Sequence, residues 1–572
     1  MDYLDKYRLW LTKSDLESDL KAELEAIKDN DDEIKERFFK DLEFGTAGLR
    51  GILGAGTARM NVYTVRKATQ GLADYINSLN VPNRHVAIAY DSRIKSAEFA
   101  LEAAKVFAAN GIKAYLFETL KPVPLLSFTI RNLNCISGVV VTASHNSSKY
   151  NGYKAYGPDG GQLANEGARE VMQRINNIDI FKDVKIISEE EALKQGLLQY
   201  IGEEIENAYL ENVYEQHINR GIFEKAKDFK VVYTPFHGTG LVPVTKIFKK
   251  VGLKNFILVE EQTTPDGNFP TVKSPNPEEK EGFKLAIELA KKENCDLIVG
   301  TDPDCDRVGI VVRNNNGEYV NLTGNQVGAL LCEYILSQKS KMGLLPQNPY
   351  IVKTVVTSEM VRAIAKEYNV NVKEVLTGFK FIAEKIKESE ETKADNFVYG
   401  FEESYGYLAG TYCRDKDAVV ASMLICEMAA YYSLQNMSLY EAMENLYKKY
   451  GYFAEGVVNI VREGLIGVTQ IANMMKKMRE SCPEEIAGIK VRAYRDYLIG
   501  KRFDKKTGEE SPLNLPASDV LYYELGECGW VALRPSGTEP KLKIYGGLCS
   551  TDEKSAKEIL NSVIKDVMER IS

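Results

Sequence analysis

Histidine is scarce in this chain, and its cysteines show no paired spacing. The 572 residues include four histidines and nine scattered cysteines. None of the histidines has the short paired spacing of a zinc hydrolase, and an odd number of cysteines without close pairs argues against both a disulfide framework and a cysteine-rich zinc site. We therefore expect reduced, mostly buried thiols, and oxygen ligands for any bound metal ion.

Long apolar runs and a positive net charge are also absent. No apolar run is long enough to span a bilayer, and residues 1–8 carry acidic side chains instead of the apolar core of a secretion signal. The sequence thus predicts a cytoplasmic protein that does not enter a membrane. With 73 basic and 81 acidic residues, the net charge of −8 disfavours general attraction to nucleic acid, so an anionic substrate would need a locally positive cleft. The sequence carries no signal of the oligomeric state.

What is present is a long alternation of strand-like and helix-like segments. The apolar run 86–90 precedes the helix-period segment 97–110, and comparable units follow along most of the chain. This alternation predicts α/β domains. The C-terminal part differs, because strand-like 543–545 is followed by the spacing of a helix capping box at 550–553, ahead of a helix over 556–571. We expect an α+β domain there.

The length suggests about four domains of ordinary size. The first ~45 residues read as a helical lead-in, because their leucines are spaced to share one helix face. Motif positions and breaks in the pattern place the domains at residues 1–205, 206–323, 324–450 and 451–572.

The segment 139–154 indicates phosphoryl transfer. An apolar strand-like run ends near Ser144, and His145 and Lys154 follow in the same segment. Side chains at the carboxyl end of such a strand face the crevice in which open α/β sheets bind ligands. A neutral serine hydroxyl is a poor nucleophile unless a base activates it or it already carries the phosphoryl group. Ser144 is the candidate covalent carrier; the alternative is a solvent-exposed loop serine.

A second strand-like run leads into three aspartates, Asp302, Asp304 and Asp306. Carboxylates at alternate positions can converge on one hard cation, and Mg²⁺ requires oxygen ligands. A calcium loop of the EF-hand type is excluded, because its glycine and glutamate positions hold Arg307 and Arg313. The pattern predicts a magnesium site with Arg307 among the residues that offset its negative charge; the alternative is an acidic surface turn.

Two further loops carry polar side chains suited to a phosphorylated sugar. Glu402 and Ser404, in the loop 400–406, can hydrogen-bond neighbouring sugar hydroxyls, although glutamates at a strand end are often merely solvated. The segment 534–541 combines an arginine fork, hydroxyls, a glycine and a lysine, which predicts a cradle for a phosphate dianion and not a bland turn. Its candidate residues are Arg534, Ser536, Gly537, Thr538 and Lys541.

Together these loops resemble those of the α-D-phosphohexomutases, the phosphoglucomutase and phosphomannomutase superfamily. Segments 45–51 and 377–380, which contain Arg50 and Lys380, match further family motifs, and Ser147 stands where many members have proline. The resemblance implies a four-domain α/β protein, with three similar mixed-sheet α/β domains and a C-terminal α+β domain around a central cleft.

The resemblance also implies the site roles. Ser144 would be phosphorylated, and Mg²⁺ would be bound by Asp302, Asp304, Asp306 and a phosphoserine oxygen. Arg50, Arg307 and Lys380 would act electrostatically, and the proton would be exchanged by Lys154, His145 or Lys380, which the sequence does not rank. Glu402 and Ser404 would bind the sugar, and the 534–541 loop would hold the phosphate that does not react.

The implied activity is reversible interconversion of α-D-glucose 1-phosphate and glucose 6-phosphate, with glucose 1,6-bisphosphate as intermediate and activator. The partners would then be small-molecule sugar phosphates, with no nucleic acid and no membrane. Three alternatives remain open: a phosphopentomutase acting on ribose or deoxyribose phosphates, a metal-dependent sugar-phosphate phosphatase, and an inactive phosphosugar-binding homologue.

Overall fold

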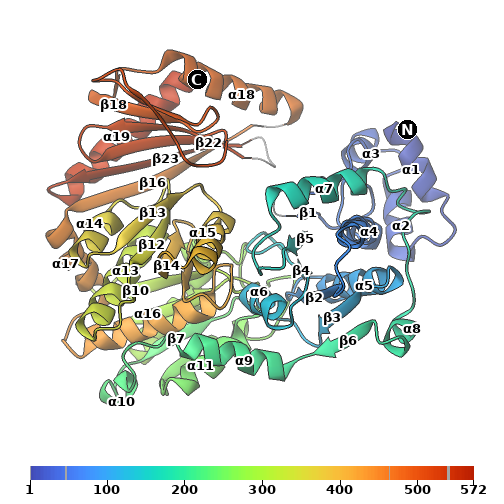
Figure 1. The fold of residues 1–572 in the computed structure, drawn as a ribbon, viewed down its shortest axis with the longest axis horizontal. Coiled ribbons are helices and arrows are strands. Elements are labelled where there is room, and N and C mark those ends of the chain that lie inside the picture. Colours follow the sequence, from blue (N-terminus) through green and yellow to red (C-terminus); the bar gives the residue numbers. More distant parts are fainter. Residues whose placement is uncertain (1, 46–47, 463, 537–540) are drawn as a thin grey trace. The chain divides into compact units, whose positions relative to one another are not determined.

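The computed structural model describes residues 2–45, 48–462, 464–536 and 541–572, which belong to two compact units (Figure 1). The first unit comprises residues 1–322, 386–388 and 406–436, and the second comprises 323–385, 389–405 and 437–572.

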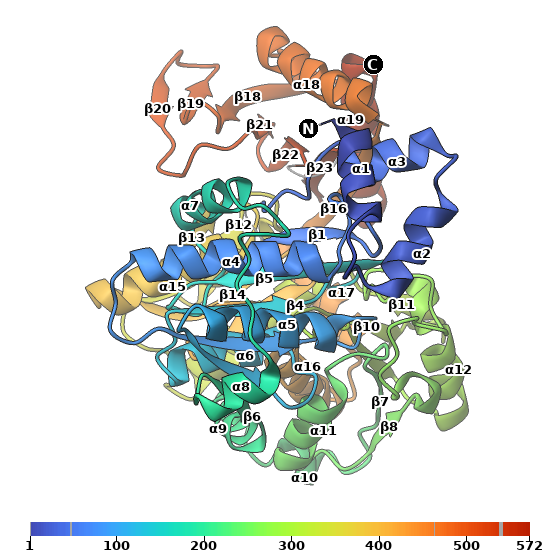
Figure 2. The ribbon, with the colours of Figure 1, turned by 90° about the vertical axis from the view of Figure 1, so that its right-hand side faces the viewer.

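The N-terminal lead-in is helical, as predicted. It forms α1 (Tyr3–Leu11), α2 (Ser18–Ala26) and α3 (Asp31–Phe38), which lie next to α4 (Val62–Ser78) in Figures 1 and 2. Trp10, Leu20 and Leu24 are buried in the same apolar cluster as residues of α4, and the Trp10 ring lies 5.5 Å from that of Tyr63. The lead-in therefore extends the core of the first unit.

The first sheet of this unit has the strand order β1-β5-β4-β2-β3-β6. Strands β2, β4, β3 and β6 are parallel, whereas β5 runs antiparallel to both β1 and β4. The strands span β1 (Leu49–Ile52), β2 (His85–Tyr90), β3 (Lys113–Phe117), β4 (Ser137–Val141), β5 (Tyr150–Tyr156) and β6 (Leu198–Ile201). The accompanying helices are α5 (Ser96–Ala109), α6 (Val123–Asn132), α7 (Asn165–Asn176), α8 (Glu189–Lys194) and α9 (Glu203–Tyr214).

The second sheet has the order β11-β10-β9-β7-β8 and is also mixed. Its strands are β7 (Val231–Thr234), β8 (Phe256–Leu258), β9 (Leu297–Thr301), β10 (Val308–Arg313) and β11 (Tyr319–Asn321). The remaining elements of the first unit are α10 (Ile222–Lys225), α11 (Leu241–Lys250), η1 (Glu260–Gln262), η2 (Lys280–Phe283), α12 (Lys284–Glu293), β15 (Gly406–Ala409) and α16 (Ala418–Ser433).

The second unit begins with parallel strands in the order β13-β12-β14. These are β12 (Pro349–Thr354), β13 (Asn371–Val375) and β14 (Asn396–Glu402), accompanied by α13 (Gly324–Lys341), α14 (Met360–Glu367), α15 (Phe379–Thr392) and α17 (Leu439–Tyr450). Strand β12 is buried almost throughout, as expected for a strand with parallel neighbours on both sides.

The C-terminal sheet is antiparallel, with the order β16-β23-β22-β21-β18-β19-β20, and β17 pairs with β18. Its strands are β16 (Tyr452–Val461), β17 (Glu485–Ile486), β18 (Ile489–Asp496), β19 (Lys501–Asp504), β20 (Glu510–Pro512), β21 (Leu521–Leu525), β22 (Gly529–Pro535) and β23 (Lys541–Ser550). Helices α18 (Gly464–Ser481) and α19 (Glu553–Ile571) complete it. The predicted fold class, α/β domains followed by a C-terminal α+β domain, is confirmed; the domain boundaries near 205, 323 and 450 stay predictions.

One expectation about cysteine is wrong. Cys528 and Cys549 form a disulfide, with 5.9 Å between their Cα atoms. They meet because β22 and β23 are antiparallel neighbours in which Trp530 lies opposite Gly547, so the register brings positions 528 and 549 together. The other cysteines are free, and all but Cys482 of these are buried, as expected.

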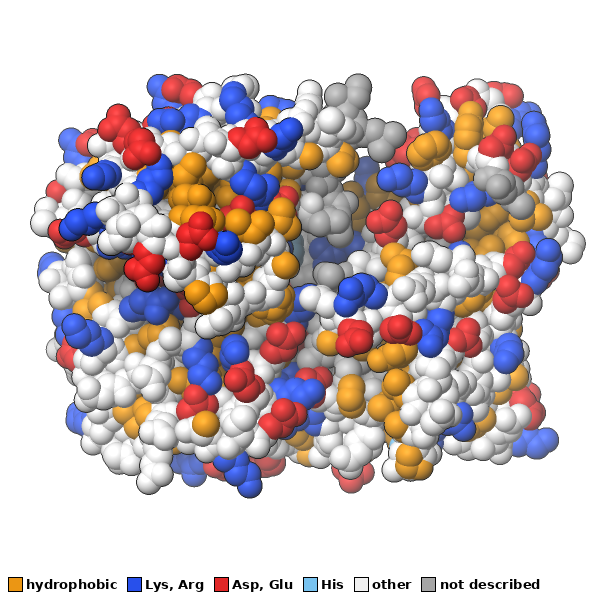
Figure 3. Space-filling model, turned by 45° about the horizontal axis from the view of Figure 1, so that its top comes forward, with side chains coloured by type: hydrophobic (Ala, Val, Ile, Leu, Met, Phe, Trp, Pro, Cys, Tyr) orange, Lys and Arg blue, Asp and Glu red, His pale blue; other side chains and the backbone are white. Residues whose placement is uncertain are grey.

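Basic and acidic side chains are interspersed over the face shown in Figure 3, where the described residues present no extended area of one charge. Among the described helices, none is both long and apolar enough to cross a membrane.

Candidate active site

The serine loop follows β4 and places Ser144 against the aspartates. Ser144 is 3% exposed and has a φ of 51°, in the left-handed region that residues other than glycine rarely adopt. Its Oγ donates to Asp302 Oδ2 at 2.8 Å and lies 3.2 Å from His145 Nδ1. The backbone N–H of Ser144 donates to Thr142 Oγ1 at 2.8 Å. The hydroxyl is therefore held between a carboxylate and an imidazole.

The three aspartates follow β9 and are fully buried or nearly so. One carboxylate oxygen from each lies within 4.8 Å of those of the other two. Backbone N–H groups of Asp306 and Arg307 donate to Asp302 Oδ1 at 3.1 and 3.0 Å. Within the described part of the chain, Asp304 Oδ1 and Asp306 Oδ1 are buried without a hydrogen-bond donor. Because an unpaired buried carboxylate oxygen is costly, this group is suited to holding a metal ion.

Cationic side chains offset part of this charge. Lys154 Nζ, on β5, lies 2.9 Å from Asp304 Oδ2, and Lys416 Nζ lies 3.1 Å from Asp306 Oδ2. Arg307 pairs with Glu278 at 3.2 Å, and its Nε lies 3.8 Å from Asp306. Lys416 is not among the predicted site residues, although it lies in the segment 414–417, which resembles the family and carries alternating charge shortly after a strand.

The burial of this group shifts its proton affinities. Burial, together with the charges of Asp304 and Asp306, raises the pKa of Asp302 well above its usual range. Burial would also raise the pKa of Asp304, but the ammonium of Lys154, a hydrogen bond with Asp302 and the charge of Lys416 together outweigh it, and the pKa is lowered. The pKa of His145 is lowered well below its usual value by burial and by the charges of Arg307 and Arg50, so its imidazole is neutral at pH 7.

Arg50 lies at the edge of the same loop. It is exposed on β1, and its Nη1 donates to Asn146 Oδ1 at 3.3 Å. The structure thus gathers Ser144, His145, Lys154, Arg50, Arg307 and the three aspartates in the first unit.

The remaining predicted residues belong to the second unit. Glu402 is buried at the end of β14 and accepts the Gly378 N–H at 2.8 Å, and Ser404 follows in the turn. Burial and the neighbouring charge of Glu402 raise the pKa of Glu403 to about 7. Burial and the charge of Arg534 lower the pKa of Lys380, although Glu384 opposes the shift.

The predicted phosphate cradle connects β22 with β23. Arg534 lies opposite Lys543, and the Ser536 N–H donates to the Lys541 carbonyl at 2.7 Å. Gly537 and Thr538 lie outside the described residues. The charge of Arg534 lowers the pKa of both Lys380 and Glu403, so Arg534 acts electrostatically on both groups within the second unit.

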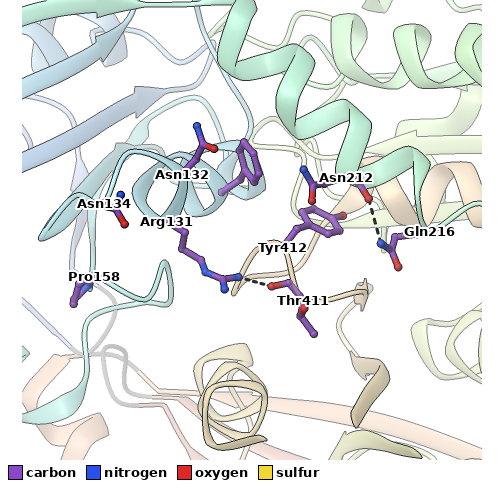
Figure 4. Close-up of a pocket in the computed structure, with 9 residues that line it drawn as sticks. Arg131, Asn132, Asn134, Pro158, Asn212, Gln216, Thr411 and Tyr412 are labelled. Carbon is purple, nitrogen blue, oxygen red and sulfur yellow. Dashed lines mark hydrogen bonds between the residues drawn. The ribbon is translucent and has the colours of Figure 1, made fainter. Parts of the chain in front are cut away.

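A separate polar pocket of about 600 Å³ lies in the first unit (Figure 4). Asparagine and glutamine side chains from α6, α9 and the segments that follow them contribute to its wall, and Arg131 donates to the Thr411 carbonyl. None of the predicted site residues is among its described lining residues.

Family models match four successive segments of the chain. They describe the alpha/beta/alpha domains I, II and III of phosphoglucomutase/phosphomannomutase, at residues 41–181, 207–317 and 323–450, and the C-terminal domain of the same proteins at 502–565. Together they cover well over half of the sequence and span both units.

Individual proteins resemble the chain over nearly its whole length. A phosphoglucomutase of Staphylococcus haemolyticus is 38% identical over 535 residues, 92% of this chain and 94% of the relative. One from Staphylococcus aureus is 37% identical over 538 residues, 94% of each chain. Among solved structures, the open form of the Paramecium phosphoprotein pp63/parafusin aligns with a TM-score of 0.68 at 17% identity, covering 93% of this chain and 95% of that one.

Proposed function

Because the chain belongs to the phosphoglucomutase/phosphomannomutase family, we propose that it reversibly interconverts α-D-glucose 1-phosphate and glucose 6-phosphate. Relatives named phosphoglucomutase, at 37–38% identity over most of both chains, support glucose phosphate as the substrate. The observation that carries the proposal is the Ser144 hydroxyl, buried 2.8 Å from Asp302 within a group of three carboxylates.

In the proposed cycle, phosphorylated Ser144 gives its phosphoryl group to the free hydroxyl of the bound sugar phosphate. Glucose 1,6-bisphosphate forms, turns end for end, and returns its other phosphoryl group to Ser144. In the first transfer the attacking sugar hydroxyl loses a proton and the leaving Ser144 oxygen gains one. In the second transfer the Ser144 hydroxyl loses its proton, and the sugar oxygen that gives up its phosphoryl group gains one. Neutral His145, 3.2 Å from the Ser144 Oγ, is able to accept the Ser144 proton and to return it.

We propose that Asp302, Asp304 and Asp306 bind Mg²⁺, with an oxygen of phosphorylated Ser144 as a further ligand. When bound, the ion neutralises negative charge on the phosphoryl group. Lys154, Arg50 and Arg307 contribute further positive charge on the reacting side, which a loose phosphoryl-transfer transition state requires.

The side chains of the second unit would bind the rest of the substrate. Glu402 and Ser404 are proposed to bind sugar hydroxyls. Lys380, whose pKa is lowered, is proposed to act electrostatically and is a further candidate for proton exchange. Arg534, Ser536, Gly537, Thr538 and Lys541 are proposed to bind the phosphate that does not react.

Replacement of Ser144 by alanine tests the proposal directly. Ser144→Ala should bring glucose 1-phosphate turnover to background, because no other hydroxyl lies against Asp302 in the described structure. It should also prevent the gain of one phosphoryl group, measured by intact mass after incubation with glucose 1,6-bisphosphate. Ser148→Ala, in the same loop, is the matched control and should retain both properties.

Turnover of Ser144→Ala near the wild-type rate would refute the carrier assignment. Release of inorganic phosphate at the rate of substrate loss would instead indicate a phosphatase. A much higher kcat/KM for ribose 1-phosphate than for glucose 1-phosphate would indicate a phosphopentomutase.

A further inference from the structure

The carbonyl groups of the serine loop are bound by one buried arginine. Arg93 is 3% exposed and lies just beyond β2, 51 positions before Ser144. Its Nη2 donates to the carbonyls of Ser144, at 2.6 Å, and Asn146. Its Nη1 donates to those of Ser147, at 2.8 Å, and Tyr150, at 3.0 Å. Both terminal nitrogens of the guanidinium therefore bind the backbone that carries the reacting hydroxyl.

The arginine is itself held in place. Its Nε lies 3.3 Å from Asp91 Oδ2 in an ion pair in which both side chains are fully buried. The other oxygen of Asp91 accepts the Arg93 N–H at 2.9 Å and the Ser96 hydroxyl at 2.7 Å, which ties the pair to the start of α5. The guanidinium carbon also lies 5.0 Å from the centre of the Phe269 ring. Arg93 is therefore held by Asp91, just beyond β2, which is in turn bound by Ser96 at the start of α5. Phe269, in the segment between η1 and η2, packs against the guanidinium.

Ser144 needs such support. Its left-handed φ is sparsely populated by residues with a side chain, and such conformations persist only where the surroundings enforce them. The Ser144 carbonyl is buried and the other three are partly buried, so Arg93 supplies donors to acceptors that have little or no access to water. A planar guanidinium offers several donors in a fixed fork, which a lysine ammonium does not reproduce.

We propose that Arg93, oriented by Asp91, is a positioning residue for phosphoryl transfer: it holds the 144–150 backbone so that the Ser144 oxygen points at the aspartate group. This inference rests on the proposed mutase function. Among the described hydrogen bonds, Arg93 contacts the serine loop only through backbone carbonyls. Its charge also acts on Asp304 and Asp302, so the test must keep that charge while it removes the backbone contacts.

Arg93→Lys is the decisive variant, because it keeps the positive charge and removes the fork. We expect kcat for glucose 1-phosphate to fall about 100-fold per folded molecule, since a small misplacement of a reacting group costs about that much. The KM should stay within about threefold, because no substrate contact is removed. Amide hydrogen exchange of residues 142–151 should become faster, whereas exchange in the core strands β2 and β4 should not.

Arg37→Lys is the matched control. Arg37 also donates to a backbone carbonyl, that of Ala55, and pairs with Glu23 and Glu33, but it lies in the helical lead-in. This variant should leave kcat and the exchange of 142–151 unchanged even if it lowers the Tm. Arg93→Ala, assayed with added guanidinium chloride at non-denaturing concentration, should regain part of the lost kcat.

The hydrogen-exchange measurement keeps the two proposals separable. If wild-type protein shows no mutase turnover, the proposed function fails, while faster loop exchange in Arg93→Lys would still show that Arg93 holds the 144–150 backbone. If wild type turns over and Arg93→Lys matches it in kcat and in loop exchange, the positioning role is overturned and the proposed function stands. Loss of activity explained entirely by a lower folded fraction would also overturn it, since that is the effect of a merely structural arginine.

Discussion

At the scale of single residues, the site depends on buried side chains of opposite charge that neutralise one another. Lys416 Nζ lies 3.1 Å from both Asp306 and Asp415, and all three side chains are at most 8% exposed. Removal of one partner from a buried ion pair leaves the other charge without compensation, which is more damaging than the loss of an exposed pair.

Lys416→Met should therefore destabilise the metal-free protein by about 3 kcal/mol, the usual cost of breaking a buried pair. Saturating Mg²⁺ should reduce that loss, because a bound cation would offset the same carboxylates. Chemical denaturation with EDTA and with Mg²⁺ measures both quantities. Lys250→Met removes an exposed pair with Glu211 and should cost less than about 1 kcal/mol in either condition. Equal losses for the two variants would contradict the expected charge compensation.

At the scale of elements, the start of α19 shows that a helix cap predicted from sequence can differ by a few residues from the cap in the structure. The sequence predicts a capping box at 550–553, yet Ser550 is the last residue of β23 and α19 begins at Glu553. The cap is Asp552, whose side chain accepts the Ser555 N–H at 2.9 Å. Strand pairing to Tyr452 holds Ser550 in the sheet, so the tertiary contact decided between two possible caps.

Asp552→Ala should lower the Tm of the second unit, because the first turn of α19 loses its side-chain acceptor. Ser550→Ala should leave the Tm unchanged, because that side chain makes no cap. Parallel thermal melts of the two variants and wild type, followed by circular dichroism, provide the comparison. A larger effect of Ser550→Ala would show that the capping box predicted from sequence is the real one.

At the scale of the whole molecule, ion pairs and an apolar cluster join two sheets within the second unit. Glu374 on β13 pairs with Lys353 at 3.3 Å, Arg362 at 2.6 Å and Arg495, on β18, at 2.8 Å. Burial would raise the pKa of Glu374, but the charges of Lys353, Arg495 and Arg362 outweigh it and lower the pKa to about 2. The parallel strands and the C-terminal sheet are also joined by a cluster of buried residues, which are Val355, Val356, Leu376, Tyr497, Val520, Tyr522, Trp530, Ala532 and Tyr545.

This shift gives the second unit an acid-sensitive contribution to stability. Because the folded pKa is depressed, the contribution is complete above the ordinary value of 4.5 and is lost as the pH falls through 4.5 towards about 2. The shift corresponds to about 3 kcal/mol. Urea unfolding at pH 7, 5, 4 and 3 should show Glu374→Gln less stable than wild type at pH 7, with the difference shrinking at pH 3.

The exposed pair of Glu510 with Lys501 offers the control for that series. Glu510→Gln should differ from wild type by under about 1 kcal/mol at every pH. A Glu374→Gln deficit that stayed constant from pH 7 to pH 3 would exclude titration of this carboxylate as its cause.

Much of the candidate site could be predicted because it lies at strand ends that the sequence marks clearly. Ser144 after β4 and the aspartates after β9 follow buried apolar runs, and polar residues there gather at the carboxyl edge of a sheet. The same rule could have found Arg93, which follows β2, but an arginine near a strand end has many uses and nothing local shows that it binds another loop.

By itself, the sequence determined the fold class, the helical lead-in, the serine loop and the three carboxylates, because hydrophobic periodicity and the chemistry of short motifs are local properties. Only the tertiary structure decided that Arg93 binds the carbonyls of residues 144–150, that Lys416 meets Asp306, that Asp552 caps α19, and that Cys528 lies opposite Cys549. These contacts join residues that are distant in the chain, or they are selected from several equally plausible local partners. Strand register decides which residues lie opposite one another, and burial decides which charges need a partner.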